Sequence, residues 1–373
     1  MKIAFVHPAF IDYRSELFEK LNKRYDIRFI FTDQDRGQEG AKEDHLRIPH
    51  KWNHKIVRSD KLMISSRPFI TYLKLMIELL RGKYDVLLTS TKWYACFCVA
   101  KIRRKKFILW TEYWHWTANN FIEKLLNSFT LFIAKHADAI IATGTKSYKA
   151  HLSVGIPSKK IFTYPQCAID YSKTSTKDLR EELGLENKKI VLYLGRIVQR
   201  KGLDYLIKAF ALLEKEIDNV FLLIVGDGPF IKECKDLAKK LNIKNIHFMG
   251  YIDPIYKASC YKACDVFVLP AIFIGSDYEP WGLVINEAMA FGKSIVATDA
   301  VGAVDDLVKD GYNGYVVKNK NIQELYEALH KILLNSDLAK VMGENSRKIF
   351  EEKNDYGKMF EAFKETIDYV WQK

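Results

Sequence analysis

Short apolar segments alternate with amphipathic segments along the whole chain of 373 residues. The apolar segments are rich in Ile, Val, Leu and Phe and contain few polar positions, which is typical of parallel strands buried on both faces. The amphipathic segments between them repeat apolar positions every three or four residues, which predicts helices. The alternation therefore predicts an α/β protein whose parallel sheets are covered by helices on both sides.

The pattern locates these elements along the chain. In the first half it predicts strands over residues 2–7, 26–31, 84–89, 106–111, 138–142 and 160–164. Helices are expected near 13–24, 69–81, 93–103, 120–136 and 145–153. The pattern restarts at 189–195 and continues with strands over 220–225, 245–249, 265–269, 293–297 and 314–317. About twelve strands are too many for one doubly wound sheet, so we expect two.

A polar segment, 165–188, separates the two halves and is the predicted domain boundary. We place one Rossmann-like domain at 1–170 and a second at 171–355, and we expect a last helix over 356–373 to pack back on the first domain. Ligands of such sheets bind beyond the carboxyl ends of the strands, so two facing sheets predict a site in a cleft between them.

The composition excludes several classes of protein. Hydrophobic residues make up 48% and charged residues 28%, as in ordinary globular proteins and unlike disordered ones. The longest stretch without a charge, 266–276, has 11 residues, whereas a bilayer span needs about 20. The first residues are expected to form a strand and not a signal peptide. Six cysteines without framework spacing favour a reducing, cytoplasmic location.

The positive charge lies in the first half of the chain. The net charge is +12, with 29 Lys and Arg against 16 Asp and Glu in residues 1–170, and 29 against 30 in residues 171–373. This asymmetry favours an anionic partner for the first half, such as a nucleic acid, a membrane surface or a phosphorylated acceptor. A solvated lysine-rich surface explains the charge equally well.

The second half has a glycine-flanked basic segment directly after its first strand. Gly195 and Gly202 enclose Arg196, Arg200 and Lys201, and a helix is expected to begin at the next residue. Cations at a helix N-terminus are unfavourable for the helix itself, whereas an anion there is favourable. The segment therefore predicts a phosphate or pyrophosphate site.

Two carboxylates occur in the segment 277–292 (DYEPWGLVINEAMAFG). Glu279 lies just before an expected helix and Glu287 eight residues later inside it, so slightly more than two turns would place both on roughly one side. Apolar neighbours such as Trp281 and Met289 argue against two solvated surface acids, and buried acids need partners. Carboxylates of this kind accept hydrogen bonds from sugar or ribose hydroxyls.

Together these motifs resemble the C-terminal domain of the retaining family-four glycosyltransferases, which have the GT-B fold. The resemblance covers residues 189–317, about a third of the chain, and the first half matches only in its α/β layout. It rests on an ordered set of motifs: Gly195-Arg196 with Lys201-Gly202, Gly226-Asp227-Gly228-Pro229, Glu279 to Glu287 as E-x7-E, Glu287-Ala288-Met289-Ala290-x-Gly292, and Asp310-Gly311-x-Asn313-Gly314.

The resemblance implies a nucleotide-sugar donor as substrate, with a UDP-sugar as first choice and GDP-mannose as second, and it implies no cofactor and no metal. Arg196 and Lys201 would hold the diphosphate and stabilise the leaving phosphate. Glu279 would hold a hydroxyl of the donor sugar and Glu287 the ribose. The remaining nucleotide contacts would come from Gly195, Gly226, Tyr251, Ile252, Gly282 and Leu283. Retention would follow from attack on the face from which the diphosphate leaves.

The first half departs from the family pattern. His7 and the residues after it stand where the family often has a Gly-rich turn, and a family histidine near the reacting sugar is matched only loosely. The segment Trp110–Trp116 (WTEYWHW) contains both Glu112 and His115, which are the preferred catalytic candidates, and the choice between His7, Glu112 and His115 stays open. The aromatic residues of this segment form either a platform for sugars or part of the core.

No metal site is expected. Asp33-Gln34-Asp35 has the D-x-D spacing of metal-dependent glycosyltransferases, but it lies in a half without nucleotide motifs and is interpreted as a polar loop. The cysteine pairs Cys96 with Cys98 and Cys260 with Cys264 lack further zinc ligands.

Two segments of the first half combine cations with apolar residues, namely 61–83 and 101–106. They favour peripheral contact with an anionic membrane surface. We therefore expect a glycosyltransferase that uses a glycan or lipid-linked acceptor in the synthesis of cell-surface polysaccharide or glycolipid. A GT-B sugar-nucleotide epimerase is the first alternative. A nucleic-acid-binding protein is the second, although the basic half has no known nucleic-acid-binding motif.

Overall fold

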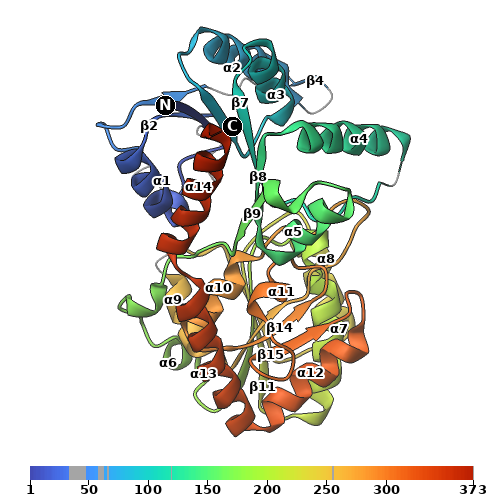
Figure 1. The fold of residues 1–373 in the computed structure, drawn as a ribbon. Coiled ribbons are helices and arrows are strands. Elements are labelled where there is room, and N and C mark those ends of the chain that lie inside the picture. The colour runs from blue at the N-terminus through green and yellow to red at the C-terminus, as the bar shows by residue number, and fades with distance from the viewer. Residues whose placement is uncertain (33–47, 58–62, 65–66, 119, 254–255, 373) are drawn as a thin grey trace. The chain divides into compact units, whose positions relative to one another are not determined.

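The computed structural model describes residues 1–32, 48–57, 63–64, 67–118, 120–253 and 256–372. The chain forms two compact units (Figure 1). Unit 1 comprises Met1–Cys167 together with Tyr356–Lys373, and unit 2 comprises Ala168–Asp355. The change from unit 1 to unit 2 thus falls inside the polar segment 165–188.

Unit 1 is built on a seven-stranded sheet with the strand order β3-β2-β1-β6-β7-β8-β9. All neighbouring strands in it are parallel. The strands are β1 Lys2–His7, β2 Asp26–Phe31, β3 His54–Ile56, β6 Val86–Thr89, β7 Lys106–Thr111, β8 Ala139–Thr143 and β9 Ile161–Tyr164. Two further short strands, β4 Met63–Ile64 and β5 Arg67–Pro68, pair antiparallel.

Helices cover both faces of the sheet in unit 1. They are α1 Asp12–Arg24, α2 Phe69–Arg81, α3 Trp93–Ile102, α4 Phe121–His136, α5 Gly144–Ser153 and α14 Tyr356–Trp371. Alternate residues of β1 enter different cores, because Phe5 packs with α1 and α14 whereas Val6 packs with α2, α3 and α4. The C-terminal helix α14 packs against α1 and against strands β7 to β9.

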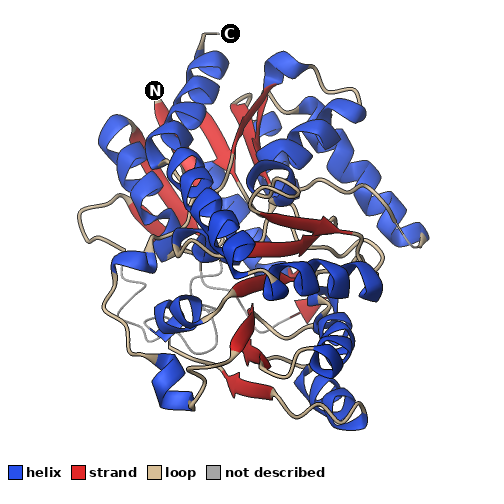
Figure 2. Ribbon diagram, turned by 90° about the horizontal axis from the view of Figure 1, so that it is seen from below, coloured by secondary structure: helices blue, strands red, loops and turns tan. Residues whose placement is uncertain are grey.

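Unit 2 has a six-stranded parallel sheet with the order β12-β11-β10-β13-β14-β15. Its strands are β10 Lys189–Leu194, β11 Val220–Val225, β12 Ile246–Gly250, β13 Val266–Leu269, β14 Ser294–Thr298 and β15 Gly314–Val317. Its helices are α6 Leu179–Leu183, α7 Leu203–Glu216, α8 Ile231–Lys240, α9 Lys257–Ala263, α10 Leu283–Ala290, α11 Val304–Leu307, α12 Ile322–Leu334 and α13 Ser336–Lys353. Two buried clusters, one on each sheet face, hold these helices in place, and Figure 2 shows helices flanking the strands.

The predicted α/β architecture with two parallel sheets is confirmed. Each predicted strand is present within two residues of its expected ends, because near-continuous apolar segments are a strong signal for buried parallel strands. Strand β3 was not predicted, since its three residues His54–Ile56 are largely polar. Within the described residues, no helix is long and apolar enough to cross a membrane.

The strand orders locate the crevices where ligands are expected. In unit 1 the order changes direction beside β1 and β6, and in unit 2 beside β10 and β13. Ligands of such sheets bind at the carboxyl ends of the strands beside this reversal. The residues that follow β1 and β7 in unit 1 and β10, β12 and β13 in unit 2 are therefore the ones to consider.

Candidate active site

In unit 2, two strand ends approach each other through glycine. Gly226 follows β11 with φ of +131°, and a Cβ atom there would lie 1.9 Å from the carbonyl oxygen of Gly195, which follows β10. The amide of Gly226 also donates to the carbonyl of Gly250 at 2.8 Å. Any side chain at position 226 would separate these backbones, so the glycine keeps the three strand ends together.

Glu279 is the centre of a buried ionic cluster. Its Oε2 lies 2.6 Å from Nζ of Lys201 and 2.6 Å from Nη1 of Arg200. The residue is only 7% exposed. Burial opposes ionisation of this carboxyl, but the two cations outweigh it and lower the pKa of Glu279. The other oxygen, Oε1, forms no hydrogen bond with the described residues and is a free acceptor.

Glu287 has a separate set of partners on helix α9. The hydroxyl of Tyr261 donates to Oε2 at 2.7 Å, and Nζ of Lys257 lies 3.4 Å from Oε1. Burial and the neighbouring carboxylate raise the pKa of Tyr261 well above its usual value, so this phenol remains a donor. Glu287 itself is 5% exposed, and its two oxygens are held in a fixed orientation.

Helical periodicity does not relate Glu279 and Glu287, because only one of them lies in the helix. Helix α10 begins at Leu283, so Glu279 precedes it by four residues and only Glu287 lies within it. The two carboxylates instead belong to two clusters, one with the residues after β10 and one with α9. Their different partners indicate different roles in one site.

Arg196 differs from the other two cations of the basic segment. Its side chain is exposed, and it forms no hydrogen bond or ion pair with any residue in the described part of the chain. Arg200, by contrast, bonds Glu279 and also the carbonyl oxygen of Tyr278. Arg196 is thus a free cation beside β10, available to an anionic ligand.

The N-terminus of α10 offers backbone donors near these cations. Gly282 is the N-cap residue with φ of +96°, a conformation that favours glycine, and no side chain caps the helix. The first amides of a helix have no intrahelical acceptor and favour an anion. Gly282 and Leu283 therefore lie where a phosphate would find backbone donors.

The predicted nucleotide turn lines a cavity. Tyr251 and Ile252 follow β12 and form the wall of a cavity of about 310 Å³, together with Tyr256, Ser259 and Cys260 of the α9 region. Tyr251 is 51% exposed. One side of α9 thus borders this cavity, and its adjacent side reaches Glu287 through Lys257 and Tyr261.

In unit 1, a buried arginine binds Glu112. Arg14 lies in the first turn of α1 and is 7% exposed. Its Nη2 lies 2.5 Å from Oε1 of Glu112, and its guanidinium carbon lies 4.3 Å from the centre of the Trp110 ring. Burial opposes the charge, but nearby Tyr13 and Glu112 raise the pKa of Arg14 above its usual value. The ion pair fixes the carboxylate that directly follows β7.

His7 forms a buried hydrogen bond with this arginine. Its Nε2 lies 2.5 Å from Nη1 of Arg14, and its Nδ1 lies 2.7 Å from the carbonyl oxygen of Ala9. Since a guanidinium only donates, Nε2 must accept and Nδ1 must carry the proton. Burial and Arg14 lower the pKa of His7 well below its usual value, so the ring stays neutral. With 1% exposure, His7 does not present a surface to a ligand.

His115 lies in a different environment from Glu112. Partial burial and Lys146 of α5 lower its pKa, and Lys146 also stacks on Trp114, with Nζ 4.5 Å from the ring centre. The other aromatic residues of this segment pack inward. Trp110 is 1% exposed in the core, and Trp116 donates to the carbonyl of Ala150. Only part of the aromatic segment is therefore accessible to a sugar.

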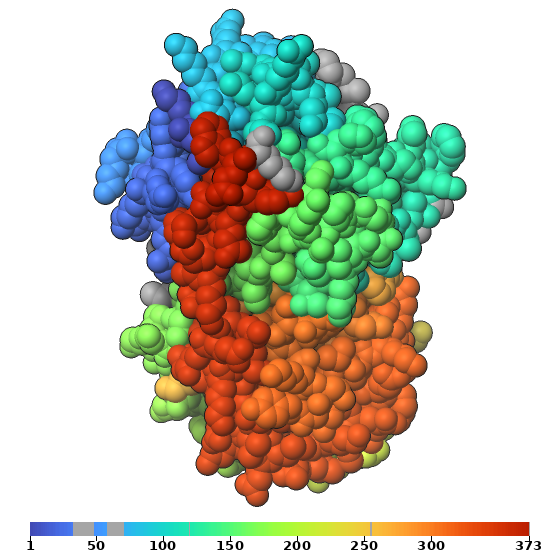
Figure 3. All heavy atoms as spheres, viewed as in Figure 1, coloured from blue at the N-terminus to red at the C-terminus, as the bar shows by residue number. Residues whose placement is uncertain are grey.

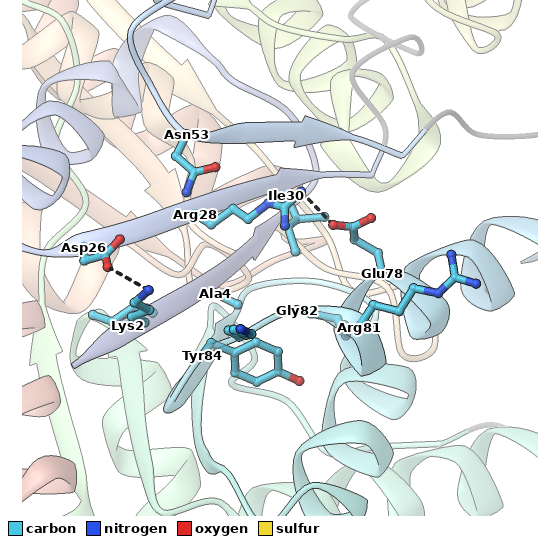
Figure 4. Close-up of a pocket in the computed structure, with 13 residues that line it drawn as sticks. Lys2, Ala4, Asp26, Arg28, Ile30, Asn53, Glu78, Arg81, Gly82 and Tyr84 are labelled. Carbon is cyan, nitrogen blue, oxygen red and sulfur yellow. Dashed lines mark ion pairs between the residues drawn. The ribbon is translucent and has the colours of Figure 1, made fainter.

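Two further features are the D-x-D segment and a cavity in unit 1. Asp33 and Asp35 of the D-x-D segment lie outside the described residues. A cavity of about 330 Å³ in unit 1 is lined by residues near the amino ends of β1 and β2, whereas Glu112 follows the carboxyl end of β7. Figure 4 shows two ion pairs among its charged groups, Lys2 with Asp26 and Arg28 with Glu78.

The architecture defines the class of protein. A solved structure of HepE from Anabaena in complex with UDP-glucose superposes with a TM-score of 0.75 at 20% identity, over 99% of each chain. This similarity shows that the chain has the GT-B fold. Residues 175–349, all of them in unit 2, match the model of the family glycosyl transferases group 1.

Curated relatives agree with this assignment. An uncharacterized glycosyltransferase of Methanocaldococcus jannaschii is 27% identical over 317 residues, which cover 80% of this chain and 79% of the relative. A GDP-mannose-dependent alpha-(1-6)-phosphatidylinositol monomannoside mannosyltransferase of Mycobacterium tuberculosis is 30% identical over 173 residues, 46% of this chain and 45% of the relative. These matches favour the glycosyltransferase among the three hypotheses.

Sequence reasoning missed several partners of the site residues. Lys257 and Tyr261 hold Glu287, and Arg14 holds Glu112. The spacing of Lys257 and Tyr261 by four residues on a short helix was a detectable signal for two side chains that face one way. No local signal links Arg14 to Glu112, since 98 residues separate them.

Proposed function

We propose that the protein is a retaining glycosyltransferase that moves a sugar from a nucleotide-sugar donor to a glycan or lipid-linked acceptor in cell-surface polysaccharide or glycolipid synthesis. The observation that carries the proposal is the buried cluster of Arg200 and Lys201 with Glu279, with the exposed Arg196 in the same segment after β10. Arg200 and Lys201 pair with Glu279, and Arg200 also lies 3.4 Å from the exposed Asp277, so Arg196 is the cation of this segment without a carboxylate partner among the described residues and leaves positive charge for a diphosphate.

The charges of this cluster suit the departure of a nucleoside diphosphate. Negative charge grows on the leaving phosphate as the glycosidic bond breaks, and fixed cations stabilise that state more than the bound donor. Arg196, exposed and unpaired within the described residues, and Lys201 supply these cations, and the first amides of α10 add donors. These groups would stabilise the leaving diphosphate in place of a metal ion, so we expect transfer to proceed without a metal.

The two carboxylates would divide the donor between them. The free Oε1 of Glu279 would accept a hydroxyl of the sugar, while its Oε2 stays bonded to Lys201 and Arg200. Glu287, oriented by Tyr261, would accept the ribose hydroxyls. Tyr251 and Ile252 would line the nucleotide. A UDP-sugar is our first choice, supported by HepE with UDP-glucose, and GDP-mannose is second, supported by the mycobacterial relative.

In unit 1, Glu112 is our candidate for the acceptor side. The Arg14 pair holds its carboxylate in place while its side chain stays 31% exposed, so the acceptor hydroxyl can reach it. His115 is the second candidate, and its lowered pKa keeps it a neutral proton acceptor near pH 7.

The experiment is a transfer assay in excess chelator with UDP-glucose or GDP-mannose and a membrane lipid extract as acceptor. We expect release of the nucleoside diphosphate that depends on the acceptor, and a product whose anomeric configuration matches the donor by NMR. An inverted product would contradict retention, and strict Mn²⁺ dependence would contradict a metal-independent site. Turnover of the donor into an epimer without acceptor would identify the epimerase alternative instead.

A further inference from the structure

The outer side of helix α4 carries large apolar side chains that are 44% to 79% exposed. Phe121 is 79% exposed, Ile122 70% and Leu125 61%, and Phe129 and Phe132 are each nearly half exposed. These five residues, called the α4 apolar face below, recur every three or four positions and therefore form one stripe along the helix. The other side of α4 is buried in the core of unit 1.

The neighbouring helices extend this apolar surface. Helix α3 packs beside both α2 and α4. Leu73, Ile77 and Leu80 of α2 and Ile102 of α3 are also at least 40% exposed. Helices α2 to α4 thus hold half of the 18 large apolar side chains that are exposed among the described residues. Figure 1 shows α4 extending away from the sheet, and Figure 3 shows its blue-green atoms at an edge of unit 1. Such a concentration marks an interaction surface.

The charge around the α4 apolar face indicates the kind of partner. Residues 69–136 contain 11 Lys and Arg against 4 Asp and Glu. Lys124 and Lys135 lie exposed on α4 beside the stripe, and Lys101 and Arg104 are exposed at the end of α3. A second copy of the same surface would bring like charges together. An anionic lipid surface instead attracts the basic residues, and each one strengthens binding by about fivefold.

We propose that the α4 apolar face docks the protein on an anionic lipid surface. Phe121, Ile122 and Leu125 enter the interface between headgroups and acyl chains, while Lys124 and Lys135 contact lipid phosphates. Helix α4 lies outside the two basic segments that the sequence had suggested for membrane contact.

The location of α4 connects this surface with the acceptor side. Helix α4 begins nine residues after Glu112, and the chain between them contains Trp114 and His115. The start of α4, where the lipid surface would dock, is therefore close in sequence to the residues proposed to receive the acceptor. This part of the inference rests on the proposed function, whereas lipid binding itself does not.

The test is cosedimentation of the full chain with vesicles of phosphatidylcholine alone or with 30% phosphatidylglycerol, at low and high salt. We expect binding to the anionic vesicles only, weakened by salt. The double variant Ile122→Glu with Leu125→Glu should lower the partition coefficient roughly tenfold or more, since charged residues replace two inserting side chains. The matched control Leu334→Glu with Val341→Glu, at exposed apolar positions of unit 2, should bind like the wild type.

Further measurements separate the outcomes. Thermal unfolding checks that both double variants fold, and a thermal shift with UDP and GDP checks nucleotide binding, which the α4 variant should retain. Equal vesicle binding by the wild type and the α4 variant would overturn the inference. The inference would also be overturned if the wild type does not bind vesicles but forms a dimer in light scattering, and the α4 variant is a monomer. If the wild type binds neither UDP nor GDP, the proposed function is contradicted, whereas the lipid-binding result is unaffected.

Discussion

The two units use buried charge in different ways. In unit 2, Glu279 pairs with two cations from one short segment after β10, Arg200 and Lys201, and the sequence had singled out all three residues. In unit 1, Glu112 is held by a single arginine 98 residues away, with neutral His7 behind it. Both sets of pairs join residues far apart in the chain, but those of unit 2 lie in segments whose residue types had indicated a site, whereas Arg14 gave no such signal. The match to the family model covers residues 175–349, so Glu279 lies inside it and Glu112 lies outside it.

The strongest test of this comparison is Lys201→Ala. We expect transfer to fall roughly 100- to 1000-fold, because the departing phosphate loses a fixed cation and Glu279 keeps only Arg200. Arg196→Ala and Glu287→Ala should also remove most transfer. Lys208→Ala is the control, since that lysine pairs with Asp204 on the surface of α7 and should act like the wild type. Initial rates of nucleoside diphosphate release check this, and near-normal rates in all three variants would contradict the donor site.

On the acceptor side, Arg14→Met should lower kcat roughly 100-fold without changing donor affinity, because Glu112 loses the group that orients it. Arg14→Lys should restore part of the rate, since it keeps the charge but loses the second bond. The control is Arg28→Met in the same unit, which breaks an ion pair with Glu78 at the far edge of the sheet. A matching loss of donor affinity in Arg14→Met would show that the two units are not divided in this way.

A smaller effect is expected for Tyr261→Phe. Removal of the hydroxyl takes away the donor that fixes Glu287, and the remaining Lys257 contact is long at 3.4 Å. We expect KM for the donor to rise about fivefold with kcat nearly unchanged, because the ribose contact contributes to binding and not to the reacting bond. Steady-state kinetics with varied donor measure this, and a fall in kcat alone would assign Tyr261 elsewhere.

The smallest effect concerns stability against pH. Since burial and Arg14 hold the pKa of His7 below its usual value, the unfolded chain binds a proton that the folded chain does not, and stability falls as pH drops below about 6.5. His7→Gln should reduce this slope by about one proton, whereas His247→Gln, at an exposed position, should leave it unchanged. Urea unfolding between pH 5 and pH 7.5 gives the slopes. An unchanged slope in His7→Gln would mean that His7 is not held neutral.

Sequence patterns predicted nearly the whole fold, because strands such as Val220–Val225 are apolar throughout and can only be buried. They also brought Arg196, Lys201, Glu279 and Glu287 forward as candidates. What they could not predict is pairing at a distance. The bond of Arg14 to Glu112 depends on how α1 and β7 meet, and the separate clusters of the two glutamates depend on where α10 begins. Likewise, only the structure shows which side of α4 is left uncovered.

The central claim is that unit 2 binds a nucleotide-sugar through its own charged groups. Calorimetric titration of UDP-glucose and GDP-mannose into the wild type and Glu287→Ala, in excess chelator, tests it most directly. We expect one of the two donors to bind the wild type at a single site and to lose most of its affinity in Glu287→Ala. Equal binding by the two proteins, or no binding of either donor until a divalent metal is added, would contradict the account.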